Sequence, residues 1–103
     1  MYKRQRLQRE GIIMVVLTVA KENHTLVTDP IITTPGVLDA NDDEDVFLAL
    51  VDEVYNAVEE STRKARRVKR DTIENVARSA VRRIIKHEVG KNPPIDVRIQ
   101  YVE

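Results

Sequence analysis

The chain has 103 residues, of which 42% are hydrophobic and 33% charged, and its 17 basic and 17 acidic side chains give a formal net charge of zero. This balance argues against a dedicated nucleic-acid or membrane-surface protein, because such proteins carry a basic excess. The chain has no cysteine, which excludes disulfides and thiolate metal sites and fits a cytoplasmic setting.

The first ten residues differ in composition from the rest of the chain. They contain four basic side chains and a single aliphatic one, Leu7. We therefore predict that residues 1–10 are a linker or a non-native start, and that one small domain covers residues 11–103.

The segment from Gly11 to Val19 is the most apolar part of the chain and is rich in β-branched residues. It predicts a strand with two apolar faces, which needs cover on both sides. A membrane-spanning helix requires about 20 apolar residues, so we expect no membrane segment.

A polar break over residues 21–24 predicts a hairpin. Thr25–Thr28 is the expected second strand, antiparallel to the first. Pro30 cannot donate to a ladder, so this strand lies at an edge or ends there. An alternative interpretation extends it past a bulge into residues 31–34.

Two amphipathic helices are predicted next. The polar residues 41–45 suit the capped, acidic start of a helix, and apolar residues then recur every four positions to a predicted end near Thr62. The second helix is expected to begin at Asp71, where Asp71 and Glu74 resemble a capping box. Gly90 and the two prolines after it end this helix.

The final segment, Ile95 to Val102, alternates between apolar residues (Ile95, Val97, Ile99 and Tyr101) and the polar residues Asp96, Arg98 and Gln100. This pattern predicts a strand with one solvated face. The complete order is β-β-α-α-β, and the expected fold class is α+β, with a three-stranded sheet covered on one face by two helices.

Such a fold leaves the other sheet face uncovered. The first strand places on that face either Ile12, Met14 and Val16 or, with the opposite parity, Ile13, Val15, Leu17 and Val19. An apolar centre with a charged rim is typical of an interface, so we predict self-association as a dimer or larger assembly. The alternative is that a loop, or the first ten residues, folds back over this face.

Catalytic chemistry finds little support in the sequence. His24 lies in the predicted turn, and His87 lacks the second histidine of a His-Glu-x-x-His motif because residue 91 is Lys. The acidic residues 42–45 point in different directions on a helix and serve better as caps than as metal ligands. We predict no catalytic residue, no metal ligand and no cofactor in this chain, and a small enzyme is the least supported hypothesis.

A basic run between the helices is the other candidate site. Its six cations are Arg63, Lys64, Arg66, Arg67, Lys69 and Arg70. They suit contact with RNA phosphates, or equally a solvated helix end near the negative pole of the helix dipole. The run contains no aromatic residue for base stacking.

The segment from Arg9 to Val19 resembles the opening of the C-terminal domain of ribonuclease J, in which an acidic-Gly pair leads into a Val-rich strand. Asp29-Pro30-Ile31-Ile32 and Gly36 are similar to the family's Pro-Asp-Ile-Ile segment and glycine turn, although Pro30 follows the acid and residues 33–35 depart from the usual Ser-Arg. The residues 82–85 and 91–95 resemble the family's basic helix and Pro-containing turn. The resemblance covers about residues 6–103.

This resemblance implies a non-catalytic accessory or oligomerisation domain of an RNA-degrading and RNA-processing enzyme. The parent would be a cytoplasmic, zinc-dependent 5′-to-3′ exonuclease and endonuclease of the metallo-β-lactamase superfamily, with a β-CASP insertion. None of the family's zinc-binding motifs occurs in the sequence, so no catalytic residue is carried over, and zinc and RNA belong to the parent. The alternative is a stand-alone RNA-binding module that uses the basic run 63–70.

Overall fold

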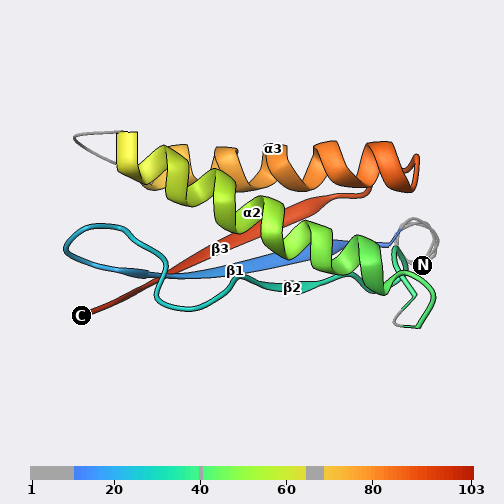
Figure 1. Cartoon of the computed structure of the whole chain (residues 1–103), viewed down its shortest axis with the longest axis horizontal. Helices are drawn as coiled ribbons and strands as arrows, with labels where there is room; N and C mark the ends of the chain where they lie inside the picture. The colour runs from blue at the N-terminus through green and yellow to red at the C-terminus, as the bar shows by residue number, and fades with distance from the viewer. Residues whose placement is uncertain (1–10, 40, 65–68) are drawn as a thin grey trace, which may run out of the picture.

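The computed structural model describes residues 11–39, 41–64 and 69–103 (Figure 1). Within these ranges the elements are β1 (Ile13–Ala20), β2 (Ile31–Thr33), α2 (Glu44–Lys64), α3 (Arg70–Glu88) and β3 (Ile95–Val102). The strands form one sheet, and both helices lie on the same side of it, which confirms the predicted two-layer α+β fold. The predicted linker at residues 1–10 lies outside the described residues.

β1 is the central strand of the sheet, in the order β2-β1-β3. It pairs antiparallel with β2, with Val15 opposite Ile32, and parallel with β3, with Val15 opposite Val97. A central strand has strands on both sides, and here it also has helices on one face. This position accounts for the apolar residues on the side of β1 that meets the helices.

The prediction of a second strand at Thr25–Thr28 is wrong. This segment lies antiparallel to β1 through a bridge between Leu26 and Val19 and two backbone hydrogen bonds, but it forms no strand, and β2 begins after Pro30. The side chain of Asn23 accepts hydrogen bonds from the backbone N–H and the hydroxyl of Thr25, and His24 takes a left-handed φ of 60°. These contacts form the turn, and the pairing is interrupted only before Pro30, which has no N–H to donate. The alternative interpretation, which extends the strand past a bulge into residues 31–34, includes the observed β2.

The start of α2 is fixed by a reciprocal pair of carboxylates. Asp39 Oδ1 accepts hydrogen bonds from the N–H groups of Asn41 (2.8 Å) and Asp42 (3.1 Å), and Asp43 Oδ2 accepts one from the N–H of Asp39 (2.8 Å). The first turn adds Glu44 and Asp45, which suit the positive pole of the helix dipole. The main capping acceptor at the entry to α2 is therefore Asp39, which lies before the predicted capping residues 41–45, and of those residues Asp43 closes the turn.

α3 begins one residue earlier than predicted, and the expected capping box at Asp71 is absent. Lys69 is the N-cap residue and makes no side-chain cap hydrogen bond, while Glu74 pairs with Arg70 across one turn. The predicted stop at Gly90 is confirmed, since Gly90 has a φ of 77° and its N–H donates to the carbonyl of Ile85.

A single core lies between the helices and one face of the sheet. Its fully buried side chains come from β1 and both helices, and include Ile13, Val15, Leu17, Val19, Leu50, Val54, Val58, Ile73, Ala77 and Val81. Val97 and Ile99 of β3 are buried as well. This confirms the predicted apolar face of the last strand.

Candidate functional site: the open face of the sheet

The structure decides which side of β1 the described helices and loops leave uncovered. Ile13, Val15 and Leu17 are completely buried against the helices. Because successive side chains of a strand point to opposite faces, Ile12, Met14 and Val16 lie on the other side. We call this side, away from the helices, the open face.

The open face combines residues of all three strands. By alternation they are Ile12, Met14, Val16, Thr18, Ala20, Ile31, Thr33, Asp96, Arg98, Gln100 and Val102. The strand register places Met14 between Thr33 and Asp96, and Val16 between Ile31 and Arg98. The face is therefore apolar along β1 and β2 and polar along most of β3.

The apolar half is accessible to a partner. Met14 is 39% exposed and Ile31 is 57% exposed, and Ile12 and Val16 are partly exposed beside them. We call these four side chains the apolar strip. Sequence reasoning missed Ile31, because it placed the second strand before Pro30. The β-branched pair Ile31-Ile32 directly after Pro30 was the available signal, with one residue buried and its neighbour exposed.

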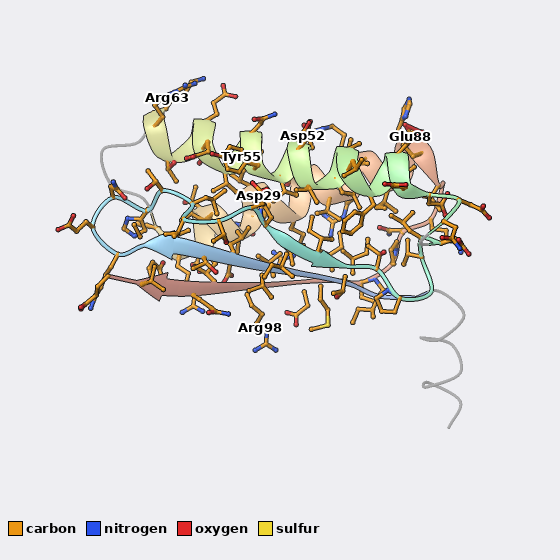
Figure 2. The ribbon with its side chains drawn as sticks, turned by 60° about the horizontal axis from the view of Figure 1, so that its bottom comes forward. Asp29, Asp52, Tyr55, Arg63, Glu88 and Arg98 are labelled. Atoms are coloured by element: carbon orange, nitrogen blue, oxygen red, sulfur yellow. The ribbon has the colours of Figure 1, made fainter. Side chains whose placement is uncertain are left out.

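The polar half contains one ion pair along β3. Arg98 Nε lies 3.2 Å from Asp96 Oδ2, on side chains that are both largely accessible. Figure 2 shows Arg98 extending from the sheet on the side opposite Tyr55 and Asp52 of α2. These are the only charged side chains among the strand residues of the open face.

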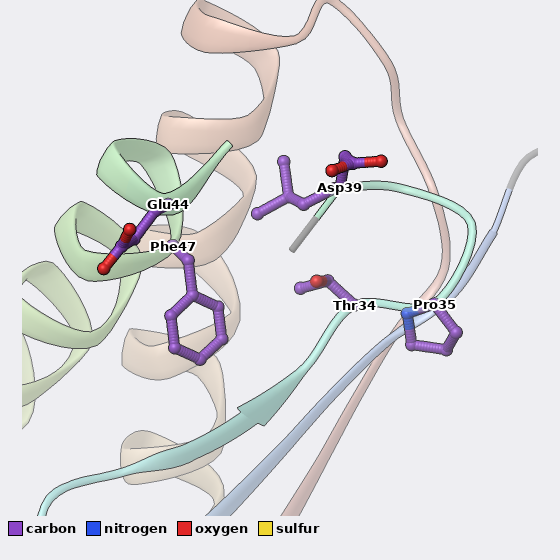
Figure 3. A pocket seen from close by; sticks show the side chains of 6 residues that line it. Thr34, Pro35, Asp39, Glu44 and Phe47 are labelled. Atoms are coloured by element: carbon purple, nitrogen blue, oxygen red, sulfur yellow. The ribbon is translucent and has the colours of Figure 1, made fainter. Parts of the chain in front are cut away.

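Two surface hollows lie elsewhere on the molecule. One, of about 390 Å³, lies between the loop after β2 and the start of α2, and is lined by Thr34, Pro35, Leu38, Asp39, Glu44 and Phe47 (Figure 3). The N–H groups of Asp42 and Asn41 hold the pKa of Asp39 below its ordinary value, because they stabilise its charged form. This carboxylate therefore serves to fix the turn that leads into α2.

The second hollow, of about 410 Å³, is lined by Thr25, Tyr55, Glu59, Thr62 and Arg63. A hydrogen bond between the Tyr55 phenol and the Glu59 carboxylate raises the pKa of Tyr55, since the bond favours the neutral phenol beside a negative charge. The Thr62 hydroxyl donates to the carbonyl of Glu59. Tyr55 and Thr62 thus both interact with Glu59, one with its carboxylate and the other with its backbone carbonyl.

The basic run is only partly described. Arg63, Lys64, Lys69 and Arg70 are exposed, whereas Arg66 and Arg67 lie outside the described residues. Lys64 bonds Glu60 at 2.9 Å, and Arg70 lies 3.4 Å from Glu74. Two of the four described cations are thus already paired with carboxylates, which weakens their electrostatic attraction for a phosphate group.

The two histidines lie apart from each other. The His24 ring packs edge-on against the Tyr101 ring, with 5.7 Å between the ring centroids. His87 is exposed in the last turn of α3, and its Nδ1 atom lies 3.8 Å from Glu88 Oε1. Within residues 11–39, 41–64 and 69–103, no three His, Asp or Glu side chains gather as a metal site would require. None of the helices described has the length and apolar character needed to cross a membrane.

Comparison with known families gives one match that spans nearly the whole chain. The family model of the ribonuclease J C-terminal domain matches residues 1–102. A search of curated proteins finds no match. The matched range includes every element of the described fold.

Proposed function

The chain belongs to the ribonuclease J C-terminal domain family, and we propose that it is a non-catalytic accessory domain that self-associates through its open face. The observation that carries this proposal is the apolar strip on the central strand and its neighbour. Soluble domains seldom leave a contiguous apolar patch rimmed by charges unless it meets a partner.

Under this proposal the chemistry belongs to other parts of a parent enzyme. Family membership supports a role in RNA processing and degradation, and the zinc-dependent exonuclease and endonuclease activities would be supplied by catalytic domains outside this sequence. This chain would then contribute assembly of the cytoplasmic enzyme and make no contact with the reacting phosphodiester.

The energetics favour a modest contact. Complete burial of an exposed aliphatic or Met side chain contributes about 1.5–3 kcal/mol, so four half-exposed side chains supply on the order of 3–6 kcal/mol per copy. Association itself costs on the order of 4–15 kcal/mol. The apolar strip alone therefore gives a weak dimer, and the polar half of the face must be compatible with the same contact.

Adjacent residues of β1 offer a matched test. Val15 is completely buried and Val16 is partly exposed on the open face. Val15→Asp should unfold the domain, because it places a carboxylate without a partner in the core. Val16→Asp should leave a folded monomer, since the new carboxylate lies beside Arg98.

Sedimentation velocity and far-UV circular dichroism of the 103-residue chain distinguish these outcomes. We expect a concentration-dependent dimer for the unmodified chain and a concentration-independent monomer for Val16→Asp, with unchanged helix content. An unmodified chain that stays monomeric at every concentration, or a Val16→Asp variant that associates as before, contradicts the proposal.

A further inference from the structure

The two charges of the open face are arranged so that the face complements itself. Asp96 and Arg98 are two residues apart on β3, point to the same side and form an ion pair at 3.2 Å. A face with one sign of charge would repel a second copy. A face with one charge of each sign matches its own copy when that copy is turned end for end.

We infer that two copies pack their open faces together about a two-fold axis that runs across the strands at the level of Val15 and Val97. This inference rests on the proposed self-association and adds its symmetry and register. In this arrangement each strand lies over the same strand of the second copy, in the opposite direction. Asp96 then lies over Arg98 of the second copy, and the reverse, so the four charges alternate in sign.

The same axis matches the apolar half. Strand pairing places Val15 level with Val97 and with Ile32. An axis at this level puts Met14 over Val16 of the second copy, and Ile31 over Thr33. Met14 and Val16 of the two copies thus cover one another, while Ile31 and Ile12 lie over Thr33 and Thr18 of the second copy. The outer layers of the dimer are the two helix pairs.

Other two-fold axes fit the face less well. An axis parallel to the strands would lay β3 over β2 of the second copy, with Arg98 against Ile31, because both are level with Val16. An axis across the strands at the level of Asp96 or Arg98 would oppose identical charges. Burying a cation against an aliphatic side chain, or holding like charges face to face, costs enough to reject these arrangements.

Charge reversal tests the register with its own control. Asp96→Arg gives four positive charges at the contact, and Arg98→Asp gives four negative ones. We expect each variant alone to weaken dimerisation roughly tenfold or more. Mixed in equal amounts, the two variants should form a heterodimer, since every cation then lies over a carboxylate. The double variant Asp96→Arg/Arg98→Asp should dimerise like the unmodified chain.

Folding defects cannot mimic recovery on mixing, so sedimentation of the mixture is the deciding measurement. If Val16→Asp abolishes the dimer but the charge variants dimerise as before, the register is wrong while the proposed function stands. If the unmodified chain is monomeric, the proposed function fails as well.

A pair of introduced cysteines distinguishes face-to-face packing of the two sheets from edge-to-edge pairing of their strands. The chain has no native cysteine, and packed sheets lie about 10 Å apart, too far for a disulfide. Asp96→Cys mixed with Arg98→Cys should therefore stay unlinked under mild oxidation. A rapid disulfide between the two would mean that β3 strands pair edge to edge, and would overturn the face-to-face arrangement.

Discussion

Gly11, at the entry to β1, and Gly90, after α3, allow a matched comparison of two glycine-to-alanine substitutions. Their φ angles are nearly equal, at 78° and 77°, but their surroundings differ. A Cβ on Gly11 would lie 2.6 Å from Val37 Cγ2 and 2.7 Å from the carbonyl carbon of Gly36, whereas a Cβ on Gly90 would meet no atom within 4 Å. Alanine at each position therefore has the same backbone strain but a different steric cost.

The strain common to both can be estimated. A left-handed conformation costs an L-residue about 1–2 kcal/mol, and replacing Gly by Ala recovers about 0.4–1 kcal/mol by restricting the unfolded chain. Gly90→Ala should thus lower the free energy of unfolding by about 0.5–1 kcal/mol.

Gly11→Ala adds the clash. The loop at residues 35–37 is held in place, because the N–H of Ile12 donates to the carbonyl of Pro35 at 3.1 Å and that of Val37 to the carbonyl of Thr34 at 3.0 Å. Overpacking of a fixed site costs about 1–3 kcal/mol, which brings the total loss to about 2–4 kcal/mol.

Equilibrium urea unfolding at low protein concentration measures both variants. A difference of about 2 kcal/mol between them moves the midpoint by about 1–2 M for a domain of this size. Equal losses for Gly11→Ala and Gly90→Ala would show that the loop yields without cost and would refute the steric reasoning.

Two further predictions concern the core and the helix cap. Leu50→Ala should lower the free energy of unfolding by about 2–5 kcal/mol because Leu50 is completely buried. Leu48→Ala, at a position that is 56% exposed, should change it by less than about 0.5 kcal/mol. Urea unfolding of the two variants checks this, and equal effects would contradict the assigned buried face of α2. The pKa of Asp39 is lowered from 3.8 in the folded state, so its contribution to stability is complete above pH 3.8 and is lost as the pH falls through the lower, folded-state value. The stability difference between the unmodified chain and Asp39→Asn should therefore shrink on acidification across that range, and a difference independent of pH would argue against the carboxylate as the cap.

Much of the fold could be predicted because its elements carry strong periodic signals. The four-residue repeat of α2 and the alternation of β3 each specify an element and its buried face. The second strand was misplaced because local turn chemistry decided it. The turn at Asn23 and His24 brings residues 25–27 back beside β1, but the pairing breaks before Pro30, which has no N–H to donate, and resumes only in β2.

The sequence predicts that one side of the first strand forms the candidate site, but it does not predict which side. Gly11–Val19 is apolar at nearly every position, and such a strand gives no sequence signal for which side meets the helices. The parallel pairing of Val15 with Val97 decides it, since the apolar side of β3 must join the same core. That pairing joins segments about eighty residues apart, which no local pattern reveals. The clue lay in β3, whose polar side identifies the open face once the two strands are adjacent.

The apolar character of β1 therefore has two separate physical causes. Its odd-numbered residues are apolar because they fill the core under α2 and α3, and a charge there has no partner. Ile12, Met14 and Val16 have no such requirement from the fold, because they face away from the helices. A selection acting on stability alone would have tolerated polar residues at these positions, as it has at Asp96 and Arg98 on the adjacent strand. The apolar residues on the open side of β1 thus meet a requirement that the isolated fold does not impose, and the proposed coverage of the open face by a second copy would account for it.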